Sequence, residues 1–273
     1  MGVIDCLLRY SSSDQVDVLL ADREGRTPLH YAVVKGRQRV IKLLADTFEF
    51  QRDKKQLTAL DYAVLGGQVE TLRVITDEMN WSGFTVDHQT RLLHCAVFGG
   101  HEDVIRYLDD DLRSDWNLVD RRNSRTCVHM AVIGNQPETL QWLLSHERVA
   151  PDLLERGDKG KRTPLHLAAR YNLVEMADLL LQFRANPCAE DAKKLTPFHY
   201  AAEGGKEVFQ VLLDHSRKLP FRLDELHTRL SKMSCLHIAA CRGGLDVLGF
   251  LIDQLGNTFD PNVQDRYKVR SCS

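Results

Sequence analysis

A short phrase recurs seven times along this chain of 273 residues, and it limits the possible folds more strongly than any other feature. Two copies read Thr-Pro-Leu-His, and most others keep Thr or Ser at the first position and His at the fourth. Successive copies are separated by 31, 33, 35, 37, 33 and 38 residues. A period of this size is typical of a solenoid, in which each repeat stacks on its neighbours. The copies begin at Thr27, Thr58, Arg91, Thr126, Thr163, Thr196 and Ser234.

Each copy also carries the chemistry of a helix start. Thr or Ser accepts a backbone hydrogen bond at the N-terminus of a helix, and Pro fits the first turn, where no amide bond is lost. Small residues such as Ala168 and Ala169 follow and allow neighbouring helices to approach closely. A second helix is indicated by apolar residues at helical spacing, as at Leu140, Leu143 and Leu144. The sequence therefore predicts two helices in every repeat.

The phrase and its period resemble the ankyrin repeat family, and the resemblance covers essentially the whole chain. It implies an all-α fold, an ankyrin-repeat α-solenoid with β-turn fingers between successive repeats. We expect seven full repeats, the sixth with a long insertion, between two truncated ones. The predicted segments are 1–21 (truncated), 22–52, 53–86, 87–119, 120–157, 158–190, 191–229, 230–264 and 265–273 (truncated).

Both ends of the sequence read as parts of repeats. Residues 1–9 match the second helix of a repeat, and residues 265–272 align with the start of the fourth repeat. Solenoids normally end in capping repeats with a polar outer face, and neither end supplies one. We therefore expect the chain to be a slice of a longer array; the alternative is a complete protein with imperfect caps.

Composition argues against several classes of function. The formal net charge is −2, so bulk attraction to nucleic acid is not expected, and no apolar run is long enough to span a membrane. The seven scattered cysteines form no Cys-x-x-Cys pair, which favours reduced thiols in the cytosol or nucleus, and we expect a cytoplasmic location. No phosphate loop, nucleophile elbow or metalloprotease motif is present. We expect no cofactor, no metal site and no enzymatic activity.

Six of the eleven histidines occupy the fourth position of the phrase. A metal site would need several of them to converge, but a whole repeat separates each from the next. In ankyrin proteins this histidine orients the finger backbone, and the resemblance implies the same role here. Asp61 replaces the histidine in the second copy, and we expect it to weaken that repeat locally. Cysteines that replace the proline of the phrase, such as Cys127 and Cys235, are expected to be structural and inert.

The resemblance implies a partner-binding groove along the first helices, at the two positions before each closing glycine. The first of these positions is apolar in four consecutive repeats and polar afterwards. An exposed apolar stripe of this kind indicates an interaction site, unless tilted helices bury it between repeats. The predicted groove residues are Val34, Leu65, Phe98, Ile133, Arg170 and Tyr171.

The fingers carry a second signal, because Lys or Arg precedes nearly every helix cap. If the repeats stack in register, these side chains form a basic ridge despite the negative net charge. Such a ridge would favour an acidic or phosphorylated peptide or an inositol phosphate; a solvated surface is the alternative. The cations are Arg23, Arg26, Lys54, Lys55, Arg91, Arg121, Arg122, Arg125, Lys159, Lys161, Arg162, Lys193, Lys194, Arg266, Lys268 and Arg270.

Two kinds of parent protein are consistent with these features. The first is a non-catalytic scaffold or adaptor that binds a protein or peptide partner. The second is the cytosolic part of a membrane cation channel of the transient receptor potential ankyrin type. The stretch from Asp152 to Asp158, running into Lys161 to Ala169, looks like a junction in the array of that channel family. Flanking sequence with several apolar spans of about 20 residues would select the channel.

Overall fold

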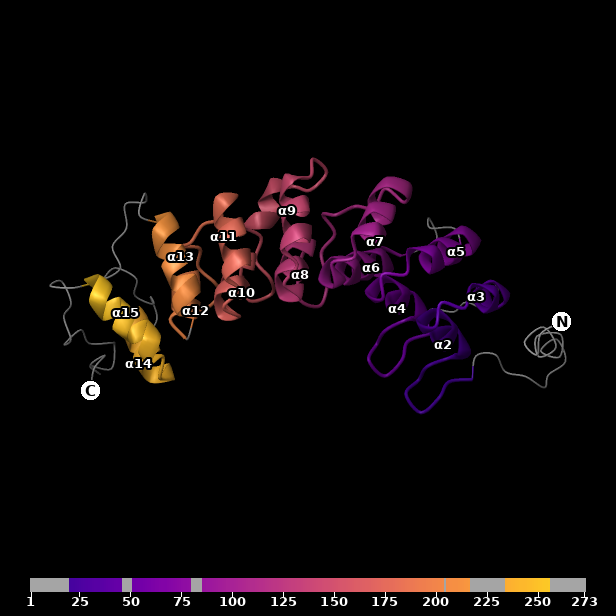
Figure 1. Ribbon diagram of the computed structural model, residues 1–273, viewed down its shortest axis with the longest axis horizontal. Coiled ribbons are helices and arrows are strands. Elements are labelled where there is room, and N and C mark those ends of the chain that lie inside the picture. Colours follow the sequence, from indigo (N-terminus) through magenta and orange to yellow (C-terminus); the bar gives the residue numbers. More distant parts are fainter. Residues whose placement is uncertain (1–19, 46–50, 80–84, 204, 217–233, 256–273) are drawn as a thin grey trace. The chain divides into compact units, whose positions relative to one another are not determined.

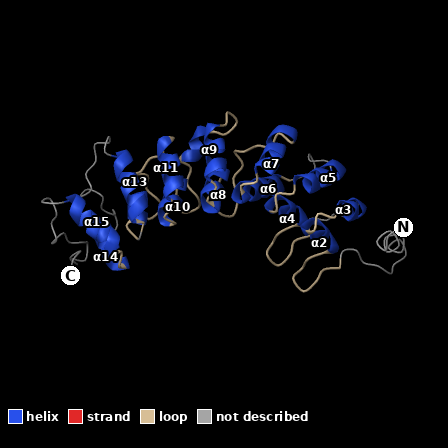
Figure 2. Ribbon diagram, viewed as in Figure 1, coloured by secondary structure: helices blue, strands red, loops and turns tan. Residues whose placement is uncertain are grey.

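The computed structural model describes residues 20–45, 51–79, 85–203, 205–216 and 234–255, and these form helices joined by turns and loops (Figure 1; Figure 2). No β-strand occurs among the elements of these ranges, so the all-α class is confirmed. The chain divides between Leu118 and Val119 into two compact units, unit 1 and unit 2. The first helix of each repeat is called inner below, and the second outer.

The described residues of unit 1 form three helix pairs, of which the last outer helix continues into a π-helical turn. The inner helices α2, α4 and α6 pack side by side, and α3 packs on α5 (Figure 1). The elements are α2 (Pro28–Val34), α3 (Gln38–Ala45), α4 (Ala59–Leu65), α5 (Val69–Met79), α6 (Val86–Gly99), α7 (Glu102–Arg106) and the turn η2 (Tyr107–Asp111).

Unit 2 repeats the arrangement, with four helix pairs in the part of it that the structure describes. The inner helix α10 packs between α8 and α12, and the outer helix α11 packs between α9 and α13 (Figure 1). The elements are α8 (Cys127–Gly134), α9 (Pro137–Ser145), the 3-10 turn η3 (Pro151–Leu154), α10 (Pro164–Arg170), α11 (Val174–Gln182), α12 (Pro197–Ala201), α13 (Lys206–Ser216), α14 (Cys235–Arg242) and α15 (Leu245–Leu255).

The recurring phrase starts most of the inner helices by a reciprocal cap. At the start of α10, the Thr163 backbone N–H donates to Nδ1 of His166 at 3.1 Å, and the Thr163 hydroxyl lies 2.9 Å from the same nitrogen. The backbone N–H of His166 is bound in turn at Thr163. The same box begins α2, α8, α12 and α14. These contacts satisfy amides that a helix start otherwise leaves open, so the phrase fixes where each helix begins.

In the first, fourth and fifth repeats, the other ring nitrogen of the histidine ties the repeat to the next finger. Nε2 of His30 lies 3.3 Å from the carbonyl oxygen of Leu57, and that of His129 lies 3.0 Å from the carbonyl of Arg162. His166 makes the same contact with Leu195 at 3.0 Å. All three rings are buried. The structural role expected for these histidines is therefore confirmed.

Asp61 takes over the capping half of the histidine's role. Its Oδ2 accepts hydrogen bonds from the Thr58 backbone at 2.8 Å and from the Thr58 hydroxyl at 3.0 Å. A carboxylate has no proton to donate to the next repeat, and the contact runs in the opposite direction, with Arg91 of α6 in the third repeat as the donor. The Arg91 Nε lies 3.4 Å from Asp61, and its Nη1 donates to the Gln56 carbonyl at 2.9 Å. The expected weakening is thus not visible at this cap, because Arg91 pairs with the buried carboxylate.

The third repeat departs from the predicted pattern. Helix α6 begins at Val86, ahead of the phrase, because Thr85 and His88 form a cap of their own with a 2.9 Å contact. The phrase at Arg91 lies inside this helix, so the prediction that Arg91 belongs to a finger is wrong. The predicted boundary between residues 86 and 87 falls after the first residue of α6. The other repeat boundaries stay predictions.

Several predicted features lie outside the described residues. These are the first truncated repeat up to residue 19, most of the insertion in the sixth repeat, the second truncated repeat, and the finger cations Arg266, Lys268 and Arg270.

Candidate functional site

An aspartate opens each described finger and folds it into a tight turn. In the fifth repeat, Oδ1 of Asp158 accepts the backbone N–H of Gly160 at 2.8 Å and that of Arg162 at 3.1 Å. The Asp158 backbone N–H donates to the Arg162 carbonyl at 2.9 Å. Asp191 holds its finger in the same way, with 2.8 Å bonds from Lys193 and Leu195. Carboxylates that accept two backbone amides in this way preorganise the turn.

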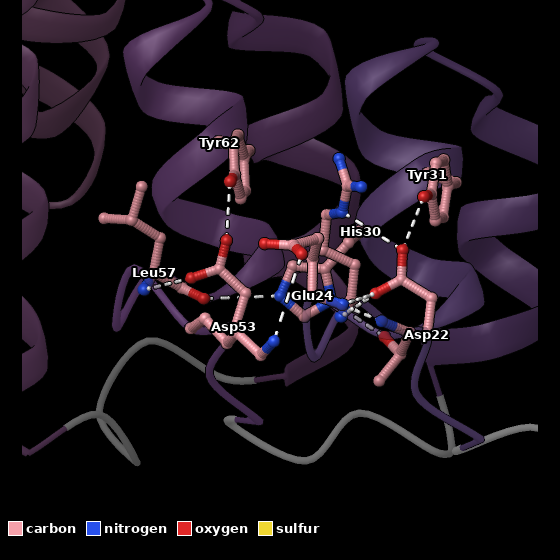
Figure 3. Close-up of polar contacts among 10 residues, drawn as sticks. Asp22, Glu24, His30, Tyr31, Asp53, Leu57 and Tyr62 are labelled. Atoms are coloured by element: carbon pink, nitrogen blue, oxygen red, sulfur yellow. Dashed lines mark hydrogen bonds and ion pairs between the residues drawn. The ribbon is translucent and has the colours of Figure 1, made fainter.

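The second carboxylate oxygen fastens the finger to the inner helix (Figure 3). The Tyr31 hydroxyl donates to Asp22 at 2.7 Å, and the Tyr62 hydroxyl donates to Asp53 at 2.6 Å. In unit 2, Tyr200 binds Asp191 at 2.8 Å. The bond from Tyr31 lowers the pKa of Asp22 to about 2, and the bond to Asp53 raises the pKa of Tyr62 to about 12.

This aspartate–tyrosine pair was not predicted, although the spacing of the two residue types in the sequence indicates it. Asp22, Asp53 and Asp191 each stand five residues before the capping threonine. The tyrosines stand nine residues after the aspartates, which places them on the inner helix facing the finger.

Neighbouring fingers are joined in register within each unit. The backbone N–H of Lys54 donates to the Glu24 carbonyl at 2.8 Å in unit 1. In unit 2 the N–H of Lys159 donates to Asn123, and that of Ala192 to Gly160, both at 2.8 Å. The fingers therefore form an ordered row in each unit, with their side chains at a fixed spacing.

Most of the predicted finger cations are exposed on these rows. Ion pairs join Arg26 to Asp22 at 3.3 Å, Lys54 to Glu24 at 3.9 Å, Arg162 to Asp158 at 2.6 Å, and Lys194 to Glu190 at 3.0 Å. Arg26, Arg125 and Arg162 are half-buried. The exposed cations are Arg23, Lys54, Lys55, Arg121, Arg122, Lys159, Lys161, Lys193 and Lys194.

The three described fingers of unit 2 concentrate positive charge. Residues 120–125, 158–162 and 190–194 contain eight Lys or Arg and four Asp or Glu, a difference of +4, in a chain whose net charge is −2. Two of the four carboxylates, Asp158 and Asp191, are buried and bound to turn amides. Cationic side chains therefore dominate the outer surface of this row.

The predicted groove residues of unit 1 lie on three adjacent inner helices. Val34 and Phe98 keep exposed fractions of 46% and 40%, and Leu65 between them is half-buried. Tyr31, with an exposed fraction of 45%, and half-buried Tyr62 lie one helical turn closer to the fingers. We call these five residues the unit 1 apolar surface. None of them carries a charge.

The predicted groove residues of unit 2 differ in chemistry. Ile133 on α8 is half-buried, whereas Arg170 and Tyr171 at the end of α10 are exposed, Tyr171 with a fraction of 51%. At the corresponding position of the next repeat, Glu203 pairs with Arg242 at 3.3 Å. This face is therefore polar, as the sequence predicts for the later repeats.

The described cysteines offer little nucleophilic chemistry. Burial raises the pKa of the Cys235 thiol to about 12, and burial next to Asp61 raises that of Cys95 to about 12. Cys127 is also buried, and burial raises the pKa of Cys188. Cys241 is exposed. Thiols with raised pKa values carry almost no thiolate near neutral pH, so they are poor nucleophiles.

Neither a metal-binding cluster nor a membrane-spanning helix occurs among the described residues. No group of three or more His, Cys, Asp or Glu able to hold a metal ion was found among the residues whose positions are described. Within the same part of the chain, no helix is both long and apolar enough to cross a membrane.

Comparisons with known proteins agree with this architecture. A region of 185 residues is 27% identical to human transient receptor potential cation channel subfamily A member 1, covering 64% of this chain but 15% of the channel. Human NF-kappa-B inhibitor alpha is 28% identical over 138 residues, covering 50% of this chain and 44% of the inhibitor. The matched region thus spans less than half of either relative.

The fold itself is shared with solved structures. The ankyrin repeat domain of human ASB11 superposes with a TM-score of 0.59 at 23% identity, covering 82% of this chain and 97% of that domain. A family model described as ankyrin repeats in three copies matches residues 2–90, 93–191 and 175–265. Since these matches span nearly the whole sequence and the helices repeat as the family requires, the chain belongs to the ankyrin repeat family.

Proposed function

We propose that this ankyrin repeat domain is a non-catalytic scaffold or adaptor that binds a segment of a partner protein. The observation that carries the proposal is the unit 1 apolar surface, where Val34 on α2 and Phe98 on α6 remain exposed on either side of half-buried Leu65 on α4. Water-exposed apolar side chains that cluster on a folded surface usually mark an interaction site.

The charge around this surface indicates the chemistry of the partner. The finger cations Arg23, Lys54 and Lys55 are exposed at one edge of unit 1, and the cationic finger row of unit 2 repeats the feature. An acidic or phosphorylated segment with apolar anchors would match both surfaces. The negative net charge argues against nucleic acid as the partner.

A crosslinked pull-down with variants tests the proposal. Phe98→Ser removes an exposed aromatic anchor from the inner helices, and we expect it to abolish partner capture without loss of folding. Leu43→Ser is a matched control, because Leu43 has an exposed fraction of 41% but lies on the outer helix α3. Equal capture by both variants, or unfolding of Phe98→Ser alone, would contradict the assignment of this surface.

The salt dependence of capture tests the finger cations separately. Contacts between exposed charges weaken when the Debye length falls, so capture should drop between about 50 mM and about 300 mM salt. If capture is insensitive to salt, the finger cations do not contribute to binding of the partner.

A second candidate is the cytosolic ankyrin region of a membrane cation channel. The similarity to the human channel favours it, because this match covers 64% of the chain. The full-length transcript decides between the two: several apolar spans of about 20 residues would select the channel. In either case we place the domain in the cytoplasm, in keeping with scattered cysteines that form no Cys-x-x-Cys pair.

A further inference from the structure

Two hydroxyl residues in unit 2 share one pattern of preceding charge. Ser124 is preceded by Arg121 and Arg122, which stand at the third and second positions before it, and Thr196 is preceded by two lysines at the same spacing. No other Ser or Thr of the sequence has Lys or Arg at both positions. Protein kinases with an acidic peptide-binding cleft select substrates by cations at these positions, so the pattern marks two candidate phosphorylation sites.

The fold separates the two candidates. Thr196 caps helix α12, with an exposed fraction of 7%, and its hydroxyl lies 2.8 Å from Nδ1 of His199. Ser124 lies on the finger, two residues before the cap at Thr126. It is half-buried, and its hydroxyl makes no hydrogen bond within the described part of the chain. A kinase can therefore reach Ser124 without breaking a helix start.

The backbone at Ser124 explains why this position faces solvent. Its φ of 55° lies in the left-handed region, and Gln56, Lys161 and Lys194 have φ values of 65°, 58° and 63° at the same place in their fingers. All three of these side chains are exposed. The left-handed conformation is unfavourable for residues that carry a Cβ, so opening of the turn also relieves strain.

The fourth finger is fastened less firmly than the sixth. Both oxygens of Asp120 accept amides of the turn itself, from Arg122 at 3.0 Å and from Asn123 at 3.2 Å, and both bonds are exposed. Helix α8 has Met130 at the position that Tyr200 occupies on α12, so it offers no hydroxyl to the finger. Kinases bind substrates as extended segments, and a turn held by exposed bonds opens at lower cost than one fastened by a buried tyrosine.

We propose that Ser124 is phosphorylated by a Ser/Thr protein kinase whose acidic cleft binds Arg121 and Arg122. The Ser124 hydroxyl attacks the γ-phosphorus of magnesium-bound ATP. The new Oγ–P bond forms as the bond from that phosphorus to the bridging oxygen of ADP breaks, and the hydroxyl proton passes to a carboxylate of the kinase. The products are ADP and phosphoserine.

Phosphorylation changes the charge of the finger row. The three described fingers of unit 2 carry a charge difference of +4, and a phosphoserine of about −1.5 to −2 charges lowers it to about +2. The fifth finger lies directly beside the modified one, because the Lys159 backbone N–H donates to the Asn123 carbonyl at 2.8 Å. An acidic partner segment would then bind less tightly, a consequence that rests on the proposed function.

Incubation of the folded chain with an arginine-directed kinase and magnesium ATP tests the site. The probe is the catalytic subunit of cyclic-AMP-dependent protein kinase, which selects two arginines at these positions. We expect tandem mass spectrometry to place phosphate on Ser124 and to find Thr196 unmodified. Ser124→Ala should lose this phosphate.

Replacement of the two arginines tests the recognition step. Arg121→Gln combined with Arg122→Gln should slow the modification of Ser124 at least about tenfold, because the kinase cleft loses both cations. Lys54→Gln combined with Lys55→Gln is the matched control, since it removes two adjacent exposed cations from another finger. This control should leave the rate unchanged, and circular dichroism melting establishes that each variant is folded.

Three results would overturn the assignment: no phosphate on Ser124, an unchanged rate in the double arginine variant, and modification of Thr196 as fast as Ser124. Partner capture at about 50 mM salt tests the consequence, and kinase treatment should weaken capture by the wild-type chain but not by Ser124→Ala. Unchanged capture by the phosphorylated chain would overturn the regulatory effect and leave the site. If Phe98→Ser also leaves capture unchanged, the proposed function fails independently of the phosphorylation site.

Discussion

At the scale of single residues, the second repeat depends on a pair of charges that the other repeats lack. Asp61 is buried to an exposed fraction of 1%, and its nearest cation is Arg91 on the following inner helix. A buried carboxylate that loses its cationic partner keeps its desolvation cost, and removing one partner is therefore more harmful than the net strength of the pair suggests.

We expect Arg91→Ala to lower the free energy of unfolding by about 1–3 kcal/mol, since the two bonds from Thr58 still support the carboxylate. Arg106→Ala, which removes an exposed pair with Glu102, should cost less than about 1 kcal/mol. Thermal melting by circular dichroism measures both. Equal effects would mean that Asp61 does not depend on Arg91.

The buried histidines should make stability depend on pH. Burial lowers the pKa of His129 from 6.5 to about 4, so the folded state holds the neutral ring while the unfolded chain binds a proton below about pH 6.5. The neutral His129 ring therefore contributes fully to the free energy of unfolding above about pH 6.5. This contribution is lost as the pH falls toward about 4, and its total is on the order of 3 kcal/mol.

Denaturant unfolding of the wild-type chain and of His129→Gln, at about pH 7.5 and about pH 5, measures this contribution. Glutamine does not titrate in this range, so the stability lost on acidification should be smaller in the variant. An identical loss in both proteins would show that other groups cause the pH dependence.

At the scale of elements, each finger is fixed to its inner helix by one hydroxyl. Tyr200 and Asp191 are buried, whereas Tyr31 is exposed and its bond to Asp22 competes with water. The same chemical bond should therefore stabilise the sixth repeat more than the first, because an unpaired buried acceptor is costly.

We expect Tyr200→Phe to lower the free energy of unfolding by about 1–2 kcal/mol, and Tyr31→Phe to change it by less than about 0.5 kcal/mol. Melting of both variants gives the comparison. Amide exchange of Lys193 and Lys194 reports on the finger directly, and it should accelerate only in Tyr200→Phe. A larger effect of Tyr31→Phe would contradict the burial argument.

Helix α6 shows why the start of an element is harder to predict than its existence. The Arg91 copy of the phrase marks the correct helix, but the cap at Thr85 begins it earlier. Both Thr85-x-x-His88 and Arg91-x-x-His94 fit parts of the pattern, and only the first places a hydroxyl at a helix start. The capping residue Thr85, and not the position of the phrase in the repeat, therefore sets the residue at which α6 begins.

At the scale of the whole molecule, cysteine accessibility reports whether the array is folded. Cys127 and Cys235 are buried on inner helices of unit 2, while Cys241 on the last of these helices is exposed. In the native protein at about pH 7.5, we expect iodoacetamide to label Cys241 and to spare the other two. Mass spectrometry of the labelled peptides measures this. Rapid labelling of Cys235 in the folded chain would show that α14 is not packed as described.

The sequence alone determined the repeat architecture and most helix starts, because these follow from local chemistry that recurs at one period. Through its resemblance to ankyrin proteins it also predicted the structural role of the histidines and the residue positions of the groove and fingers, since repeats place equivalent positions on one face.

Only the tertiary structure decided which of those side chains are exposed to solvent and which are held in ion pairs. Burial separates exposed Val34 and Phe98 from half-buried Ile133. Ion pairs join Arg91 to Asp61 of the preceding repeat and Arg162 to Asp158 across the turn of one finger. The physical reason is that solvent exposure and charge pairing depend on residues about one repeat away or across a turn, whereas capping depends on residues three apart.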